Sequence, residues 1–204
     1  MRRQRLWWMG LILPLGASAC GTSDEPSGPA TEFIAEDAVQ ISGESLLASC
    51  DQELFLPEFE NAETESWIVV NPLDPDHMVA VWMQDTYRRR GFITAITFDG
   101  GVSWELVPIT GLTLCTGGVW PSVADPWLTF AANGDLYAAS LGIGDEDEKA
   151  VMVSKSVDGG LTWGPPTTIS STELPLEDDK ESITADPVDP CTVYLGWTQF
   201  ESDN

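Results

Sequence analysis

Basic residues are scarce in this chain of 204 residues. Nine Lys and Arg stand against 33 Asp and Glu, which gives a formal net charge of −24 at pH 7. Binding to the phosphates of nucleic acid or of anionic lipid headgroups needs clustered Lys and Arg. The composition therefore excludes nucleic acid as a partner and argues against direct adhesion to an anionic membrane. The simplest role of the charge is to keep an exported protein soluble.

Residues that build metal and nucleophilic sites are equally rare. His77 is the only histidine, and no two of the four cysteines form a Cys-x-x-Cys pair. A zinc site and a Ser-His-Asp triad are therefore disfavoured. A calcium surface made of carboxylates is the alternative for so acidic a chain, but no Asp-x-Asp-x-Asp-Gly loop of the EF-hand type supports it. We expect no cofactor and no metal.

The N-terminus reads as a targeting segment. Three arginines among the first five residues precede an apolar run at 6–16, which is too short to span a bilayer. The Ala-Ser-Ala triplet at 17–19 suits an ordinary signal peptidase, whereas the cysteine directly after it suits lipoprotein processing. We predict a signal peptide at 1–19 and a Cys-anchored flexible tether and lead-in at 20–60. The protein is then a cell-envelope lipoprotein, on the outer or plasma membrane, that touches the membrane only through lipidated Cys20; plain secretion is the alternative.

The remaining cysteines leave their pairing open. Without Cys20, the chain keeps Cys50, Cys115 and Cys191. Export permits disulfides, but three cysteines are an odd number. One pair with one cysteine left over and a partner outside this chain are both compatible with the sequence.

The strongest positive signal is a repeated turn. The segments 97–104 and 156–163 both read Ser/Thr-x-Asp-Gly-Gly-x-Ser/Thr-Trp, roughly one blade of a repeat protein apart. In such a turn the Asp carboxylate and the hydroxyl accept from backbone N–H groups, Gly supplies a positive φ, and Trp folds back into the core. We therefore assign these residues a structural role. They are Thr97, Asp99, Gly100, Gly101, Ser103, Trp104, Ser156, Asp158, Gly159, Gly160, Thr162 and Trp163.

The repeat extends to four strands per unit. The predicted strands are 67–70, 78–83, 92–98 and 103–107 in the first unit, 127–130, 136–141, 151–156 and 162–169 in the second, and 182–185 and 193–198 in the third. Four antiparallel strands per unit are typical of a β-propeller blade. We predict an all-β partial propeller over 61–204, with two four-stranded blades and half of a third, as a fragment of a ring with six or more blades.

The two turns resemble the Asp boxes, or BNR repeats, of the sialidase-like β-propeller superfamily. The resemblance covers residues 65–200 and implies a propeller fold. It does not decide the activity, because the same box occurs in sialidases, other glycosidases and non-catalytic binding propellers. Strand parity places the boxes at one end of the blades and the loops after the second strands at the other. The substrate face of the sialidases that this chain resembles lies opposite the boxes.

Residues 85–90 follow a second strand and so lie on the face opposite the boxes, which makes them the best candidate for a ligand or substrate site. Asp85 and Arg88 loosely resemble an acid/base loop. A sialidase would also need separated arginines for the substrate carboxylate, a Tyr nucleophile and an assisting Glu. The Arg-Ile-Pro motif is missing, and the only arginines after the leader are the adjacent ones at 88–90. The alternative role for this run is a solvated loop that pairs with the acidic loop at 145–148.

Two functions remain. In the first, the chain is an exported binding or scaffold propeller without chemistry of its own, whose ligand is a glycan or a protein on the face opposite the boxes. In the second, it is the N-terminal part of an exo-glycosidase of the sialidase type, whose other catalytic residues lie beyond residue 204. In both cases we predict that this chain alone is inactive.

Overall fold

The computed structural model describes residues 38–50, 61–85, 91–145, 148–173 and 175–201. Its strands are β1 (Glu63–Asn71), β2 (Asp74–Gln84), β3 (Gly91–Thr97), β4 (Glu105–Pro108), β5 (Ser122–Phe130), β6 (Leu136–Ile143), β7 (Lys149–Ser156), β8 (Thr167–Thr172), β9 (Leu176–Ala185) and β10 (Val193–Glu201). A short 3₁₀ helix, η2 (Leu114–Thr116), lies between β4 and β5. No helix in these ranges is long and apolar enough to cross a bilayer.

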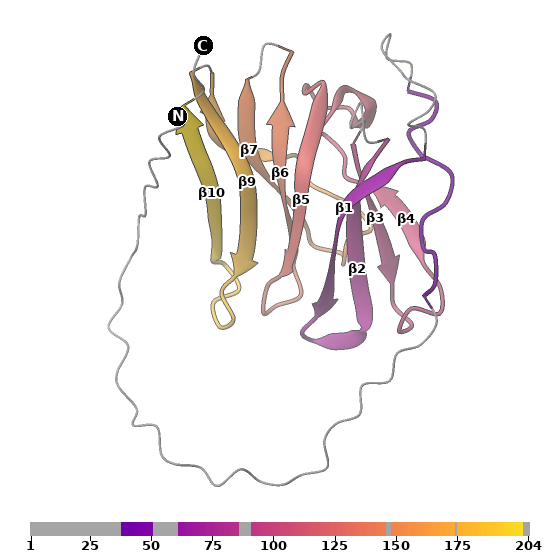
Figure 1. Ribbon diagram of the computed structural model, residues 1–204. Coiled ribbons are helices and arrows are strands. Elements are labelled where there is room, and N and C mark those ends of the chain that lie inside the picture. Colours follow the sequence, from indigo (N-terminus) through magenta and orange to yellow (C-terminus); the bar gives the residue numbers. More distant parts are fainter. Residues whose placement is uncertain (1–37, 51–60, 86–90, 146–147, 174, 202–204) are drawn as a thin grey trace, which may run out of the picture.

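The strands form three antiparallel sheets that stand side by side (Figure 1). The first has the order β1-β2-β3-β4, the second the order β5-β6-β7-β8, and the third is the β9-β10 hairpin. The predicted fold class is therefore confirmed: the chain forms two four-stranded blades and half of a third. We call the end with the β1–β2, β5–β6 and β9–β10 turns the turn end, and the opposite end, where β1, β5 and β9 begin, the bulge end.

The first strand of each sheet is longer than predicted. The sequence pattern placed the starts of these strands at 67, 127 and 182, whereas β1, β5 and β9 begin at Glu63, Ser122 and Leu176. A β-bulge interrupts each of them, so the alternation of apolar and polar residues changes phase at the bulge. The predicted strand at 162–169 begins only at Thr167, after two prolines that cannot donate to a sheet ladder.

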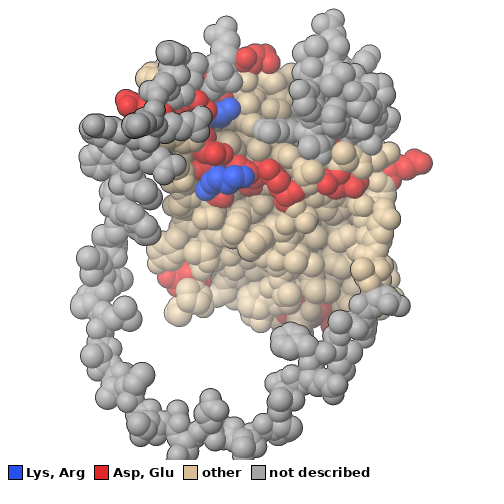
Figure 2. Space-filling view, in the orientation of Figure 1, with Lys and Arg blue, Asp and Glu red and all other residues tan. Residues whose placement is uncertain are grey.

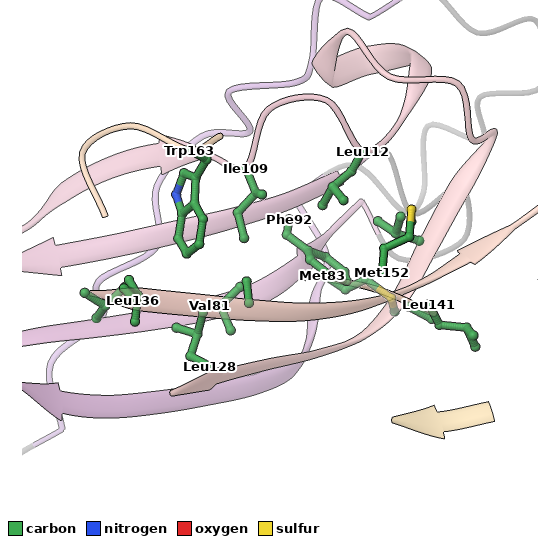
Figure 3. Close-up of a cluster of buried hydrophobic side chains, with 14 of the residues drawn as sticks. Val81, Met83, Phe92, Ile109, Leu112, Leu128, Leu136, Leu141, Met152 and Trp163 are labelled. Atoms are coloured by element: carbon green, nitrogen blue, oxygen red, sulfur yellow. The ribbon is translucent and has the colours of Figure 1, made fainter. Parts of the chain in front are cut away.

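The main core lies between the first and second sheets. Side chains of β2 and β3 meet side chains of β5, β6 and β7, and residues after β4 close the space from one side (Figure 3). The participants shown there include Val81, Met83, Phe92, Ile109, Leu112, Leu128, Leu136, Leu141, Met152 and Trp163. β2 is buried along most of its length and β6 likewise. Burial on both faces explains why these strands read as continuous apolar runs.

His77 joins the first sheet to the second at the turn end. The ring is 4% exposed, and its Nε2 lies 3.0 Å from the carbonyl oxygen of Gly159 in the second sheet. Its Nδ1 lies 2.9 Å from the side-chain amide nitrogen of Asn71. The neutral tautomer with hydrogen on Nε2 satisfies both contacts, because it donates to the carbonyl and accepts from the amide. Phe98 stacks on the ring, with centroids 4.3 Å apart.

A disulfide ties the lead-in to the body of the molecule. Cys50 pairs with Cys115 in η2, and Leu47, just before it, is buried against the outer face of the first sheet. Cys191 is exposed and has no disulfide partner among the described residues. Of the alternatives that the sequence left open, the structure selects one pair with one cysteine left over. The predicted signal peptide and Cys20 lie outside the described residues.

Candidate functional site

The two Asp-Gly-Gly turns have matching hydrogen bonds that stay within each hairpin. In the first, Oδ1 of Asp99 accepts from the backbone N–H of Ser103 at 2.9 Å, and Oδ2 accepts from the Ser103 hydroxyl. The hydroxyl of Thr97 accepts from the backbone N–H of Gly101 at 2.9 Å. The second turn repeats these contacts with Ser156, Asp158, Gly160 and Thr162. Both glycines of each turn have a positive φ.

These contacts also fix the charge of the two turn aspartates. The Ser103 hydroxyl, with its backbone N–H and the Thr97 hydroxyl, lowers the pKa of Asp99 to about 2. The Thr162 hydroxyl in the same way lowers the pKa of Asp158. Hydrogen bonds to the charged form of a carboxylate favour that form. Both aspartates therefore carry a full negative charge at neutral pH, and that charge is engaged by its own hairpin.

The structure describes one member of the predicted pair Asp85 and Arg88. Asp85 follows β2 at the bulge end, as expected, but is only 1% exposed. Its carboxylate accepts from the Ser45 hydroxyl at 2.8 Å and from the backbone N–H of Asn61 at 2.9 Å. These contacts hold the lead-in against the first sheet and favour an anchoring role over proton transfer. Arg88 and the rest of 86–90 lie outside the described residues, so the pairing stays a prediction.

A different set of residues comes together at the bulge end. In each of β1, β5 and β9, two bulge residues face a single residue of the neighbouring strand. The first residue of each bulge is charged and has a left-handed backbone: Glu65 at φ 55°, Asp125 at φ 56° and Lys180 at φ 52°. Glycine is the residue that ordinarily adopts this conformation at low cost. Strain of this kind is often retained at ligand sites.

The three bulge residues form one continuous row. Oε2 of Glu65 accepts from the backbone N–H of Asp125 at 2.9 Å, which connects the first sheet to the second. Nζ of Lys180 donates to Oδ1 of Asp125, which connects the third sheet to the second. The Asp125 carboxylate raises the pKa of Lys180. Figure 2 shows acidic side chains gathered in a band across the upper part of this face, with basic side chains among them, above a mainly uncharged surface.

Two tryptophans lie directly beside the charged row. Trp67 and Trp127, each just after its bulge, stack with ring centroids 3.8 Å apart. Both line an open groove of about 570 Å³ that runs between the second and third sheets. Its other walls carry Thr129, Ser182 and Tyr194. An aromatic surface with a few polar groups around it is the usual make-up of a small-ligand site.

A buried carboxyl group lies next to this row. Glu181, the second bulge residue of β9, is 2% exposed. Apart from its own backbone N–H, its carboxylate oxygens have no hydrogen-bonding partner among the described residues. Burial, together with the smaller effects of the Asp125 and Asp179 charges, raises the pKa of Glu181 to about 8. Glu181 is therefore mainly protonated and neutral at pH 7.

Sequence reasoning missed the bulge row, although one signal could have found it. Glu65-Ser66-Trp67 and Asp125-Pro126-Trp127 are aligned with each other and precede equivalent apolar strands. The third bulge, Lys180-Glu181, has the opposite charge at its first position and is followed by Ser182, where the other two are followed by Trp. Within the described ranges, no cluster of three or more His, Cys, Asp or Glu side chains has a geometry that could hold a metal ion.

No protein-family model matches the sequence, and a search of the curated proteins finds no match. Among solved structures, the chain is similar to a Hadza microbial sialidase, Hz136, with 14% identity and a TM-score of 0.45 over 52% of this chain and 26% of that one. It is also similar to a complex of the GH93 α-L-arabinofuranosidase of Fusarium graminearum with arabinobiose, with 13% identity and a TM-score of 0.37 over 59% of this chain and 35% of that one. The chain thus spans about a quarter and about a third of these proteins.

Proposed function

We propose that this chain belongs to an exported, sialidase-like propeller that binds a glycan at its bulge end. The observation that carries the proposal is the stacked pair Trp67 and Trp127 on the wall of the groove. The flat C–H face of a sugar ring packs on an indole ring, while its hydroxyls reach polar side chains around it. Thr129, Ser182 and Tyr194 also line this groove. The Thr129 hydroxyl accepts from the Ala185 N–H and can still donate, and the Tyr194 hydroxyl donates to Asp186 and can still accept.

The charge beside the groove favours a neutral glycan. Glu65 and Asp125 lie in the row next to the tryptophans, and Lys180, the one cation of the row, is already paired with Asp125. A sugar that carries a carboxylate, such as a sialoside, would meet repulsion from these groups and from the chain's net charge of −24. We therefore expect neutral oligosaccharides to bind more tightly than sialylated ones.

The test is a binding measurement on the full chain against a panel of neutral and sialylated oligosaccharides. Trp67→Ala and Trp127→Ala should each weaken binding of a neutral oligosaccharide about five- to thirtyfold, since each removes a stacking surface worth about 1–2 kcal/mol. Val102→Ala, at a position that is 86% exposed in the first Asp-Gly-Gly turn, is the matched control and should bind normally. Binding that survives both tryptophan substitutions would overturn the proposal.

A second candidate is the N-terminal part of an exo-glycosidase. It is favoured by a neutral, buried Glu181 that lies in the same bulge as Lys180, the partner of the Asp125 carboxylate. Glycosidases use two carboxyl groups held in different protonation states. Asp85 and Arg88 stay the predicted acid/base loop of this candidate. The longer protein should be assayed on fluorogenic glycosides, a sialoside among them. Absence of turnover by a protein with confirmed folding would exclude this candidate.

Export and lipid anchoring complete the proposal. We expect Cys20 to carry the lipid and the tether that follows it to separate the propeller from the membrane. Mass spectrometry of the mature protein should find Cys20 as the modified N-terminal residue, and Cys20→Ser should release the protein into the soluble fraction. A mature protein that begins at Cys20 without lipid would support plain secretion instead.

A further inference from the structure

The third sheet packs against the second through β9, and this interface holds two buried carboxyl groups. β9 contacts all four strands of the second sheet, and Asp178 and Glu181 are 0% and 2% exposed. The Asp178 carboxylate has three hydrogen-bond donors: the Ser170 hydroxyl in β8 and the side chains of Trp197 and Gln199 in β10. Glu181 has no comparable donor.

The environment of Glu181 does not favour a negative charge. The other charged residues of its own strand are Glu177, Asp178, Asp179 and Lys180. The one cation among them, Lys180, donates to Asp125 of β5 instead. The other titratable or charged side chains on strands packed against β9 are Tyr137 of β6, Lys149 and Lys155 of β7, and Tyr194 and Glu201 of β10, while β8 has none. Lys155 pairs with Asp135 and the Tyr194 hydroxyl donates to Asp186.

We propose that Glu181 makes the docking of the β9–β10 hairpin onto the second sheet dependent on pH. The neutral carboxylic acid stays buried when the hairpin is docked. The carboxylate needs water or a donor, and it reaches water only when the hairpin separates from the second sheet. Raising the pH through the range in which Glu181 ionises therefore shifts the hairpin toward the undocked state.

The direction of this pH dependence follows from the pKa of Glu181 in the docked and undocked states. Burial raises the pKa of docked Glu181 to about 8, above the ordinary value of 4.5 that it has in solvent. The docked state therefore holds one more proton between these values, so docking is most favourable below about pH 4.5 and weakens as the pH rises toward 8. Above pH 8 both states are ionised at this group, and the dependence levels off.

Docking of the hairpin also completes the groove beside the two tryptophans, so the pH that controls docking also controls the groove. One wall of the groove carries Trp127 and Thr129 from the second sheet, and the other carries Ser182 and Tyr194 from the third. When the hairpin undocks, the second wall is lost and Trp127 keeps only its stack on Trp67. The same change of pH thus opens or closes the site that these two sheets share, whatever ligand it takes.

Hydrogen exchange measured by mass spectrometry on the full chain, from pH 5 to pH 9, tests the proposal. Each exchange rate is divided by the intrinsic rate at the same pH to give a protection factor. For β9 and β10 we expect this factor to fall by up to about tenfold per pH unit as the pH approaches 8, and to level off above it. The protection of β2 and β3 in the first sheet is the internal reference and should stay constant.

Two variants separate Glu181 from the other acidic groups. Glu181→Gln keeps the shape of the side chain but cannot ionise, so its β9 protection should not change with pH. Asp179→Asn, its neighbour on the same strand, should keep the pH dependence of the wild type. A wild-type protection factor for β9 that is equal at pH 5 and pH 8.5 overturns the proposal without any variant, and so does a pH dependence that survives Glu181→Gln.

Discussion

The two ends of the sheets contain the same unusual backbone conformation and accommodate it differently. At the turn end, every left-handed residue of the two Asp-Gly-Gly turns is a glycine, at φ 69° to 102°. At the bulge end, the corresponding positions hold Glu65, Asp125 and Lys180. The turn end thus avoids backbone strain and satisfies its polar groups locally. The bulge end accepts strain and keeps charged side chains in a row across three sheets.

The difference indicates which end is built for stability and which for binding. A hairpin whose carboxylate, hydroxyls and amides bond to one another has no polar group left for a ligand. A row of strained, charged residues beside partly exposed indole rings, with a buried acid that has no side-chain donor among the described residues, has such groups.

Gly159→Ala should give the largest loss of stability. The new methyl group would lie 2.6 Å from Cε1 of His77 on a backbone with φ 78°, so it combines a clash with left-handed strain. We expect the free energy of unfolding to fall by about 2–5 kcal/mol. Gly117→Ala at the bulge end has φ 83° but no atom within 4 Å, and should cost only about 1–2 kcal/mol. Urea denaturation of both variants measures this, and equal losses would contradict the role given to His77.

Removing the Cys50–Cys115 disulfide, which lies at the bulge end, should give the second largest loss of stability. Replacing both cysteines by Ser should lower the free energy of unfolding by about 2–4 kcal/mol, because the unfolded chain regains the freedom of a long loop. Cys191→Ser is the control, at an exposed cysteine outside any disulfide, and should lie within about 0.5 kcal/mol of the wild type. Thermal melts with and without reductant check the result; a melting temperature that reductant does not change would refute it.

Two serines of β7 provide the third test. The Ser156 hydroxyl accepts from the buried backbone N–H of Gly160 and donates to Asp158, whereas the buried Ser154 hydroxyl has no hydrogen-bonding partner in the described part of the chain. Ser156→Ala should cost about 1–3 kcal/mol, because it leaves a buried N–H unpaired. Ser154→Ala removes an unpaired hydroxyl and should be neutral or stabilising. Chemical denaturation compares the two, and a larger loss for Ser154→Ala would be inconsistent with these contacts.

Lowering the pH should destabilise the fold mainly through the turn end, by less than the three substitutions above. The Ser103 and Thr162 hydroxyls hold the pKa values of Asp99 and Asp158 below the ordinary value of 3.8, that of Asp99 at about 2. A lowered pKa in the folded state stabilises the fold above pH 4, and this contribution is lost as the pH falls toward 2. We expect the melting temperature to drop over that range. Asp99→Asn should reduce the drop, and an unchanged acid profile in this variant would contradict the assignment.

The turn end could be read from the sequence because its interactions are local. Asp99 and Ser103 are four residues apart in the chain and bond to each other, so the motif contains its own partners. The strand order follows from the same repeat. The bulge row could not be read in this way, because Asp125 finds its partners 60 and 55 residues away. Glu65 and Asp125 share an acidic side chain two residues before a Trp, but the residue type of Lys180 does not mark it as equivalent to them.

Other features depend on burial, which the sequence shows only indirectly. Asp85 looks like an exposed loop carboxylate until the lead-in is placed over it, with Ser45 and Asn61 as its donors. Glu181 lies in a strongly acidic segment, and only the packing of β9 on the second sheet separates it from its exposed neighbours. The pairing of Cys50 with Cys115 likewise required the path of the lead-in.

The single histidine has a mechanical consequence. Its ring bridges the first β-turn of one sheet and the last β-turn of the next, with a hydrogen bond on each nitrogen and a phenylalanine on its face. Twisting one sheet against the other would break these contacts, so the ring resists relative rotation of the first two sheets at this edge of their shared core. The third sheet is held to the second by contacts of another kind: the Lys180–Asp125 ion pair and the hydrogen bonds from Ser170 to Asp178 and from the Ala185 N–H to Thr129.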